Sequence, residues 1–174
     1  MRNTLFRSIF LLFIVLLNVG CDQVSKMYVR DQVNTHKPVE LLGDFLVLIK
    51  VENEGAFLSM GSDLPMIFKT IFLLGLPAVF LLIGLIFILR KNNFSNLVLI
   101  GMSFILGGGI GNIFDRIAYG SVTDFLNMGV GGLRTGIFNL ADVSIMLGTF
   151  ILMMEFLIPK RKKSSLRFFE YSGK

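Results

Sequence analysis

The sequence is short of the residues that most often build catalytic or metal sites. Its 174 residues include one cysteine, Cys21, and one histidine, His36. A single cysteine excludes a disulfide within the chain and a multi-cysteine metal site. With no second histidine or cysteine at ligand spacing, His36 is interpreted as an ordinary exposed residue, and no metal is expected. Because His36 has no obvious partner, Ser-His-Asp chemistry is also disfavoured.

Charged residues are scarce as well. They make up 17% of the chain, against roughly 25% in soluble domains. Hydrophobic residues reach 53% and the mean hydropathy is +0.72. The net charge of +5 could suggest nucleic acid, but the basic residues gather at the chain ends and in one short loop. That distribution favours membrane orientation over a nucleic-acid partner.

Four apolar runs have the length of membrane spans. A spanning helix needs roughly 20 mostly apolar residues. The predicted spans cover about residues 5–21, 66–89, 97–114 and 137–158. Pro77 and several glycines interrupt them, which membrane helices tolerate. We therefore predict a membrane all-α fold, a four-helix bundle formed by a single domain over residues 1–174.

Lysine and arginine predict the orientation of these spans. They lie before the first span, between the second and third, and after the fourth, as Arg2, Arg7, Arg90, Lys91 and the basic tail 160–174. With four spans, all of these positions fall on one side, which is expected to be the cytoplasm. Both termini are then cytoplasmic, and segments 27–65 and 117–136 lie outside. The tail is expected to lie along the anionic lipids of the inner surface.

The first outer segment contains short β-prone runs. Residues 45–51 form one of them, bounded by Gly43-Asp44 and by residues 53–55. This pattern predicts a small antiparallel sheet over about residues 39–60, outside the membrane. Outer loop 117–136 is glycine-rich from residue 129 onward. It is either a moving flap over a site or a plain turn-rich connection.

The first span also imitates a lipoprotein signal peptide, because an apolar run ends in Gly20-Cys21. On that interpretation Cys21 would be lipidated. However, Asn18 stands where an apolar residue is expected, and three further spans follow. Cys21 is better interpreted as a small apolar residue at the outer end of the helix.

Polar residues stand at the C-terminal end of the third predicted span. An ionisable side chain in a membrane helix is a candidate functional residue. Asn112 and Arg116 are four residues apart and share a helix face, and Asp115 lies one turn from Asn112. Glycines before them allow close approach of a neighbouring helix. The alternative is that Asp115 and Arg116 only mark the water interface.

Two aspartates flank the second outer loop. Asp124 follows the third span, and Asp142 lies roughly 7 Å along the axis inside the fourth, with Asn139 one turn before it. For Asp142 the alternative role is stabilisation of the helix N-terminus. A loop of this length brings its ends together at small entropic cost. Two neighbouring carboxyls tend to share one proton, as in aspartic proteases.

These residues belong to five motifs that occur in order along most of the chain. The motifs are residues 22–26 (DQVSK), 53–56 (NEGA), 107–116 (GGGIGNIFDR), 122–125 (VTDF) and 138–142 (FNLAD). Together they resemble the lipoprotein signal peptidase (signal peptidase II) family. The family's architecture is a four-helix membrane bundle with a small outer sheet and a short helix-bearing outer loop.

The resemblance implies an enzyme that cuts prolipoproteins just before the diacylglyceryl-modified cysteine, with Asp124 and Asp142 as the catalytic pair. It implies no cofactor, and we expect a monomer. Supporting roles in binding substrate or holding the pair are expected for Asp22, Lys26, Asn53, Gly55, Gly108, Asn112, Asp115, Arg116, Asn139 and Ala141. One departure concerns Ala56, which Phe57 and Leu58 follow directly where the family has a second small residue. The shape of the outer substrate pocket is therefore left open.

Two other classes of protein fit part of the pattern. A small transporter or channel component could use intramembrane acids as proton relays. Against it, the ionisable residues cluster at one interface, with Lys69 as the main exception. A structural assembly subunit would explain the glycines, but not two aspartates placed around one loop.

Overall fold

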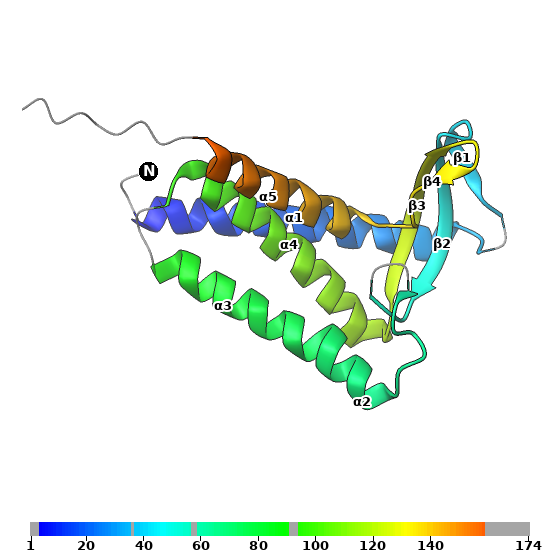
Figure 1. The fold of residues 1–174 in the computed structure, drawn as a ribbon, viewed down its shortest axis with the longest axis horizontal. Helices are drawn as coiled ribbons and strands as arrows, with labels where there is room; N and C mark the ends of the chain where they lie inside the picture. The colour runs from blue at the N-terminus through cyan, green and yellow to red at the C-terminus, as the bar shows by residue number, and fades with distance from the viewer. Residues whose placement is uncertain (1–3, 36, 57–58, 91–93, 159–174) are drawn as a thin grey trace, which may run out of the picture.

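The computed structural model describes residues 4–35, 37–56, 59–90 and 94–158. It is an elongated helix bundle with a β-sheet at one end (Figure 1). Within these described residues, four helical segments are long and apolar enough to cross a membrane: Leu5–Gln32, Met66–Arg90, Asn96–Tyr119 and Leu140–Leu157. The predicted four-helix membrane bundle is confirmed.

The helices extend differently from the predicted spans. They are α1 (Thr4–Gln32), α2 (Met66–Lys69), α3 (Leu76–Arg90), α4 (Asn96–Tyr119) and α5 (Leu140–Leu157). Helix α1 continues far beyond its predicted end at residue 21, because Asp22 and Lys26, on one face of its last turns, are buried against other elements. Helix α4 likewise continues past residue 114 and ends at Tyr119, and the next residue, Gly120, caps it in a left-handed conformation with a φ of 78°.

The second span is one continuous helical segment with a wide turn in it. The π-helical turn η2 (Thr70–Gly75) joins α2 to α3. Pro77 is the second residue of α3; it lacks an N–H, and its ring would clash with the carbonyl four residues earlier in a regular α-helix. The wider π-helical turn accommodates the proline, so the span stays helical although one backbone hydrogen bond is lost.

The sheet is antiparallel, with strand order β1-β2-β3-β4. Strands β1 (Val39–Leu42) and β2 (Leu46–Asn53) lie in the segment predicted to form a sheet. The other two, β3 (Val122–Val130) and β4 (Leu133–Arg134), come from segment 117–136, which was predicted as a loop. That interpretation was wrong: beyond the end of α4 this segment is a hairpin, and its glycines form the turn, with Gly131 at φ 57°. The outer helix implied by the resemblance is not in this segment, and residues 57 and 58 lie outside the described part.

Two clusters of buried apolar side chains form the core of the described residues. One packs α1 against α3 and α4 through Leu11, Val15, Ile88, Leu99 and Leu106. The other packs the end of α1 against the sheet through Val29, Val33, Leu48 and Phe125. The second cluster holds β2 and β3 against the end of α1, next to the candidate site.

Candidate active site

Asp124 and Asp142 line the same pocket. Asp124 lies on β3, opposite Val51 of β2, and Asp142 lies in the first turn of α5. The cavity has a volume of about 90 Å³, enough for water molecules. Its other lining residues are Asn53, Ala56, Asn112, Arg116, Val122 and Ile137. The structure therefore brings together the two acids that the sequence places 18 positions apart.

Asparagine side chains connect the two acids. Asn139 Nδ2 donates to Asp124 Oδ1 at 2.6 Å and to Asn112 Oδ1 at 3.1 Å. Asn112 Nδ2 in turn donates to Asp142 Oδ1 at 2.9 Å. One line of hydrogen bonds thus runs from carboxyl to carboxyl, and fixes both relative to the helix ends.

Asp124 is buried, and its surroundings favour the protonated form. Its side chain is only 4% exposed. Burial, assisted by the negative charge of Asp142, raises the pKa of Asp124 from 3.8 to about 6. Hydrogen bonds from Asn53 Nδ2, at 2.9 Å, and from Asn139 act in the opposite direction. Asp124 therefore keeps its proton to a higher pH than an ordinary aspartate, up to its pKa of about 6.

Asp142 is held as part of a helix cap. Its Oδ2 accepts from the backbone N–H of Asn139 at 3.2 Å, and the Asn139 side chain accepts from the backbone N–H of Asp142 at 2.9 Å. This reciprocal capping box agrees with the alternative role considered for Asp142. The cap occupies Oδ2, while Oδ1 accepts from Asn112 and the carboxyl lines the pocket.

Arg116 closes one side of the pocket. Its Nη2 donates to the carbonyl oxygen of Gly55 at 3.0 Å, so it holds the chain segment that follows β2. Gly55 N–H donates to Asn53 Oδ1 at 2.9 Å, which orients the Asn53 amide toward Asp124. Arg116 and Gly55 are thus linked to the pair through Asn53.

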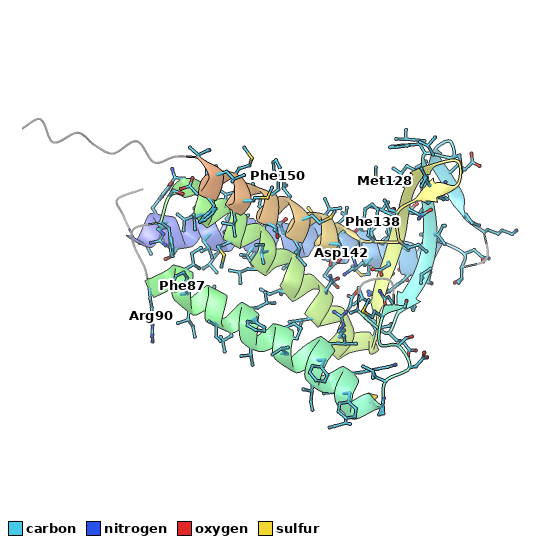
Figure 2. The ribbon with its side chains drawn as sticks, in the orientation of Figure 1. Phe87, Arg90, Met128, Phe138, Asp142 and Phe150 are labelled. Carbon is cyan, nitrogen blue, oxygen red and sulfur yellow. The ribbon has the colours of Figure 1, made fainter. Side chains whose placement is uncertain are left out.

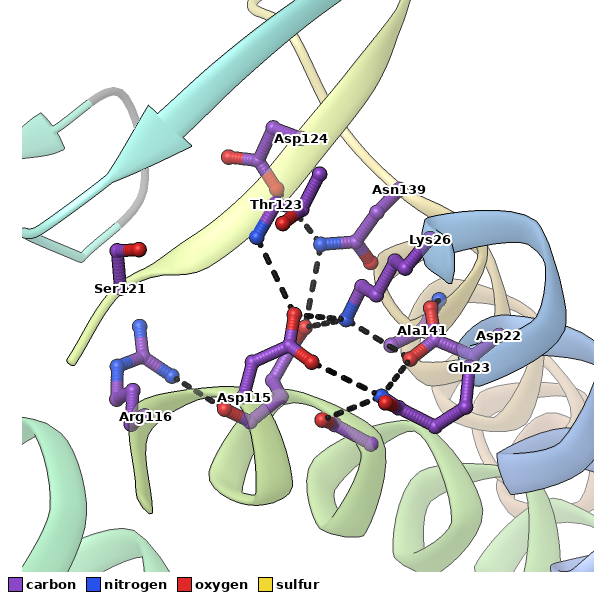
Figure 3. Close-up of polar contacts among 12 residues, drawn as sticks. Asp22, Gln23, Lys26, Asp115, Arg116, Ser121, Thr123, Asp124, Asn139 and Ala141 are labelled. Carbon is purple, nitrogen blue, oxygen red and sulfur yellow. Dashed lines mark hydrogen bonds and ion pairs between the residues drawn. The ribbon is translucent and has the colours of Figure 1, made fainter. Parts of the chain in front are cut away.

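A buried ionic cluster lies next to the pocket (Figure 3). Lys26 Nζ lies 2.8 Å from Asp22 and 3.1 Å from Asp115, and none of the three side chains is more than 1% exposed. Lys26 also donates to Asn112 Oδ1 at 2.9 Å. Full burial excludes the alternative that Asp115 only marks the water interface. The cluster holds Asn112 from the side opposite to Asp142.

The cluster also positions α5. Asp22 Oδ1 accepts from the backbone N–H of Ala141 at 2.9 Å. Gly108 lies against the Ala141 carbonyl so closely that any side chain there would collide with it. The predicted residues Asp22, Lys26, Gly108, Asp115 and Ala141 therefore lie behind the pocket, and only the others line or border it.

Three residues that the sequence analysis did not select as site residues also belong to this cluster. Arg30 lies 2.9 Å from Asp115 and donates to Thr123 Oγ1 at 2.8 Å. Thr123, next to Asp124, also donates from its backbone N–H to Asp115 at 3.2 Å and from its hydroxyl to Glu52 at 3.0 Å. Gln23 donates to both Asp22 and Asp115. The four-residue spacing of Asp22, Lys26 and Arg30 was the available signal, since it indicates one polar helix face.

Comparison with known proteins gives a consistent result. A family model described as signal peptidase (SPase) II matches residues 14–158. A lipoprotein signal peptidase of Borrelia duttonii (strain Ly) is 36% identical over 172 residues, covering 95% of this chain and 98% of its own. That of Syntrophus aciditrophicus (strain SB) is 31% identical over 145 residues, covering 82% and 89%. A solved bacterial membrane enzyme shares the fold, with a TM-score of 0.78 at 24% identity over 88% of this chain and 93% of its own. The chain therefore belongs to the lipoprotein signal peptidase (signal peptidase II) family.

Proposed function

We propose that this protein is an aspartic endopeptidase that removes signal peptides from prolipoproteins. It hydrolyses the peptide bond before the diacylglyceryl-modified cysteine, with Asp124 and Asp142 as the catalytic pair. The observation that carries the proposal is that both carboxyls line one water-sized pocket and are joined through Asn139 and Asn112. In such an arrangement one carboxyl can donate a proton while the other accepts one, as in aspartic proteases.

The two carboxyls take different parts in hydrolysis. Asp124, with its raised pKa, carries the proton and donates it to the scissile carbonyl oxygen. Ionised Asp142 accepts a proton from a water molecule, whose oxygen attacks the carbonyl carbon. When the tetrahedral intermediate collapses, the C–N bond breaks and Asp142 passes its proton to the leaving nitrogen. The new carboxyl group returns a proton to Asp124, which restores the starting state.

The polar neighbours hold this geometry rather than react. Asn53 and Asn139 donate to separate oxygens of Asp124, so its carboxyl plane is fixed. Asn112 donates to Oδ1 of Asp142 and the backbone N–H of Asn139 donates to its Oδ2, so this carboxyl is fixed as well. Arg116 orients the segment that carries Asn53, through its bond to Gly55. Such preorganisation lowers the reorganisation needed at the moment of reaction.

The site is proposed to face the outside of the cytoplasmic membrane. Helix α1 begins and α5 ends at the end of the bundle opposite to the sheet (Figure 1). Arg90 lies at that same end (Figure 2). Because basic residues favour the cytoplasmic side, the sheet and the pocket are placed on the outer side. The lipid-bearing substrate then approaches laterally, with its acyl chains in the bilayer.

The transporter alternative meets a structural difficulty. A proton relay should continue across the bundle. In the described helices, the buried ionic cluster and Arg7 lie toward opposite ends of the bundle. Between α1, α3 and α4 lies an apolar cluster that offers no proton carrier, formed by Leu11, Val15, Ile88, Leu99 and Leu106. A peptidase needs no such path.

Cleavage of a lipidated precursor tests the proposal. Wild type, Asp124→Asn and Asp142→Asn are compared at equal protein levels, with lipidated and unlipidated precursor. We expect wild type to cleave the lipidated form and both variants to be inactive. Full activity in either variant, or ion flux in reconstituted vesicles without any cleavage, would overturn the proposal.

A further inference from the structure

A second hollow adjoins the reactive pocket on the α5 side. It has a volume of about 400 Å³, and Met128, Phe138, Ile145 and Met146 supply most of its wall. Asp142 lines both this hollow and the reactive pocket, so the two spaces meet at that residue. Met128, Phe138 and Asp142 lie close together where α5 meets the sheet (Figure 2).

The hollow continues along α5 away from the sheet. A second, shallower hollow shares Ile145 and Met146 and reaches Phe150 and Met153. Residues 142, 145, 146, 149, 150 and 153 follow the helical repeat, so they form one stripe on the helix surface. We call this stripe, with Met128 and Phe138, the α5 groove.

The length of the α5 groove matches one leaflet of a membrane. From Asp142 to Met153 the helix rises about 16 Å, at 1.5 Å per residue. The hydrocarbon core of a bilayer is about 30 Å thick, so one leaflet contributes about 15 Å. A chain that starts at the reactive carboxyl and ends at Met153 would therefore cross one leaflet.

The chemistry of the groove suits hydrocarbon and not a peptide backbone. Beyond Asp142 its walls are almost entirely apolar, and the Thr149 hydroxyl donates to its own helix, at Ile145 O and 2.8 Å. A peptide N–H or C=O placed there would stay unsatisfied, which is costly in an apolar medium. The pocket on the other side of Arg116 differs, since Glu54, Lys69 and Thr70 line it. Methionines add adaptable surface to the α5 groove.

We propose that the α5 groove binds an acyl chain of the substrate's diacylglyceryl group, and so sets the preferred chain length. The inference rests on the proposed function, because it needs the scissile bond at Asp142. The nitrogen of that bond belongs to the lipidated cysteine, so the lipid begins next to Asp142, at the mouth of the groove. The chain then runs along Ile145 and Met146 toward Met153.

A pair of tryptophan variants tests this assignment. Met146→Trp fills the middle of the groove, whereas Leu147→Trp changes a neighbouring, 43% exposed residue that lines neither hollow. Two lipopeptides of the same sequence, with long and with short acyl chains, serve as substrates. We expect Met146→Trp to lower kcat/KM about tenfold or more for the long-chain substrate, through KM, with little change for the short one. Equal losses on both substrates, or the same loss in Leu147→Trp, would overturn the assignment.

Photolabelling of the unchanged protein gives an independent test. A lipopeptide with a photoreactive group at the end of one acyl chain should label α5 between residues 149 and 153. Labelling of α3 instead of α5 would contradict the assignment. So would equal labelling of α5 by a photoreactive phospholipid, if excess lipopeptide did not displace that phospholipid. The labelling does not depend on cleavage. If Asp124→Asn or Asp142→Asn stays active, the catalytic pair is refuted and the groove is not. If both variants are inactive but the label lies outside the α5 groove, the groove is refuted and the catalytic pair is not.

Discussion

Asn139 and Asp142 cap each other at the start of α5, each side chain accepting a hydrogen bond from the other's backbone N–H. The same Asn139 side chain donates to Asp124 at 2.6 Å. One residue therefore stabilises the helix end and sets the distance between the two proposed catalytic acids. These two roles use different atoms, the oxygen for the cap and the nitrogen for Asp124, so they can be separated.

Substitution of Asn139 by serine or alanine separates them. Serine keeps an oxygen for the cap but removes the Nδ2 donor, whereas alanine removes both. We expect Asn139→Ser to lose about 100-fold in kcat, because small displacements of catalytic groups are that costly. Asn139→Ala should lose similar activity and, in addition, about 1 kcal/mol of stability from the lost cap. Turnover and thermal unfolding measure the two effects. Normal turnover in Asn139→Ser would mean that the Asn139–Asp124 bond is dispensable.

The raised pKa of Asp124 predicts a pH dependence. If Asp124 donates the proton, the active form has this group protonated, which holds below its pKa of about 6. We therefore expect kcat/KM, which reports the free enzyme, to fall as pH rises through about 6. A pH profile with the lipidated precursor checks this. A rise through the same range would reverse the roles of the two carboxyls.

Neighbouring variants should move that pKa in opposite directions. Asp142→Asn removes a negative charge and so should lower the pKa of Asp124, though not fully to 3.8, because burial is the largest cause. Asn53→Ala removes a donor to the ionised form and should raise it. Infrared titration of isotope-labelled aspartate in each variant gives the values. Shifts of the same sign in both variants would contradict the described surroundings of Asp124.

The sequence predicted the four spans better than it predicted the elements around the candidate site. Four apolar runs are visible without knowledge of their partners, because lipid imposes hydropathy on each run separately. Strand β3 was missed because Val122, Thr123, Asp124 and Phe125 are all buried, so the alternation that marks a half-exposed strand is absent. Its glycine-rich end further resembled a loop.

The end of α1 was missed for a different reason. A run that contains Asp22, Lys26 and Arg30 resembles a water-exposed segment when hydropathy alone is considered. Its burial depends on partners such as Asn112 and Asp115, which lie almost ninety positions away. Motif resemblance identified Asp22 and Lys26 but not Arg30, whose contacts with Asp115 and Thr123 are visible only in three dimensions.

Two lysine variants should differ strongly in stability. Lys26 is completely buried between two acids, so Lys26→Met leaves uncompensated carboxyl charge in the interior. Removing one partner of a buried ion pair typically costs about 3–5 kcal/mol. Lys69→Met is the matched control, because Lys69 pairs with Glu54, whose side chain is 64% exposed, and exposed pairs contribute at most about 1 kcal/mol. Thermal unfolding in detergent measures both, and equal midpoints would show that the cluster around Lys26 does not stabilise the bundle.

The approach of α4 to α5 offers a matched pair of glycine substitutions. A methyl group on Gly108 would collide with the carbonyl of Ala141, which is backbone and cannot turn away. Gly108→Ala should therefore push apart the two helices that carry Asn112 and Asp142, and lower both stability and turnover. Gly20 lies in α1 with nothing within 4 Å of an added methyl group, so Gly20→Ala should gain up to about 1 kcal/mol from helix propensity alone. Unfolding midpoints and cleavage rates are compared for the two variants. If Gly108→Ala kept wild-type turnover, the close contact between α4 and α5 would not be what holds Asp142 against Asn112.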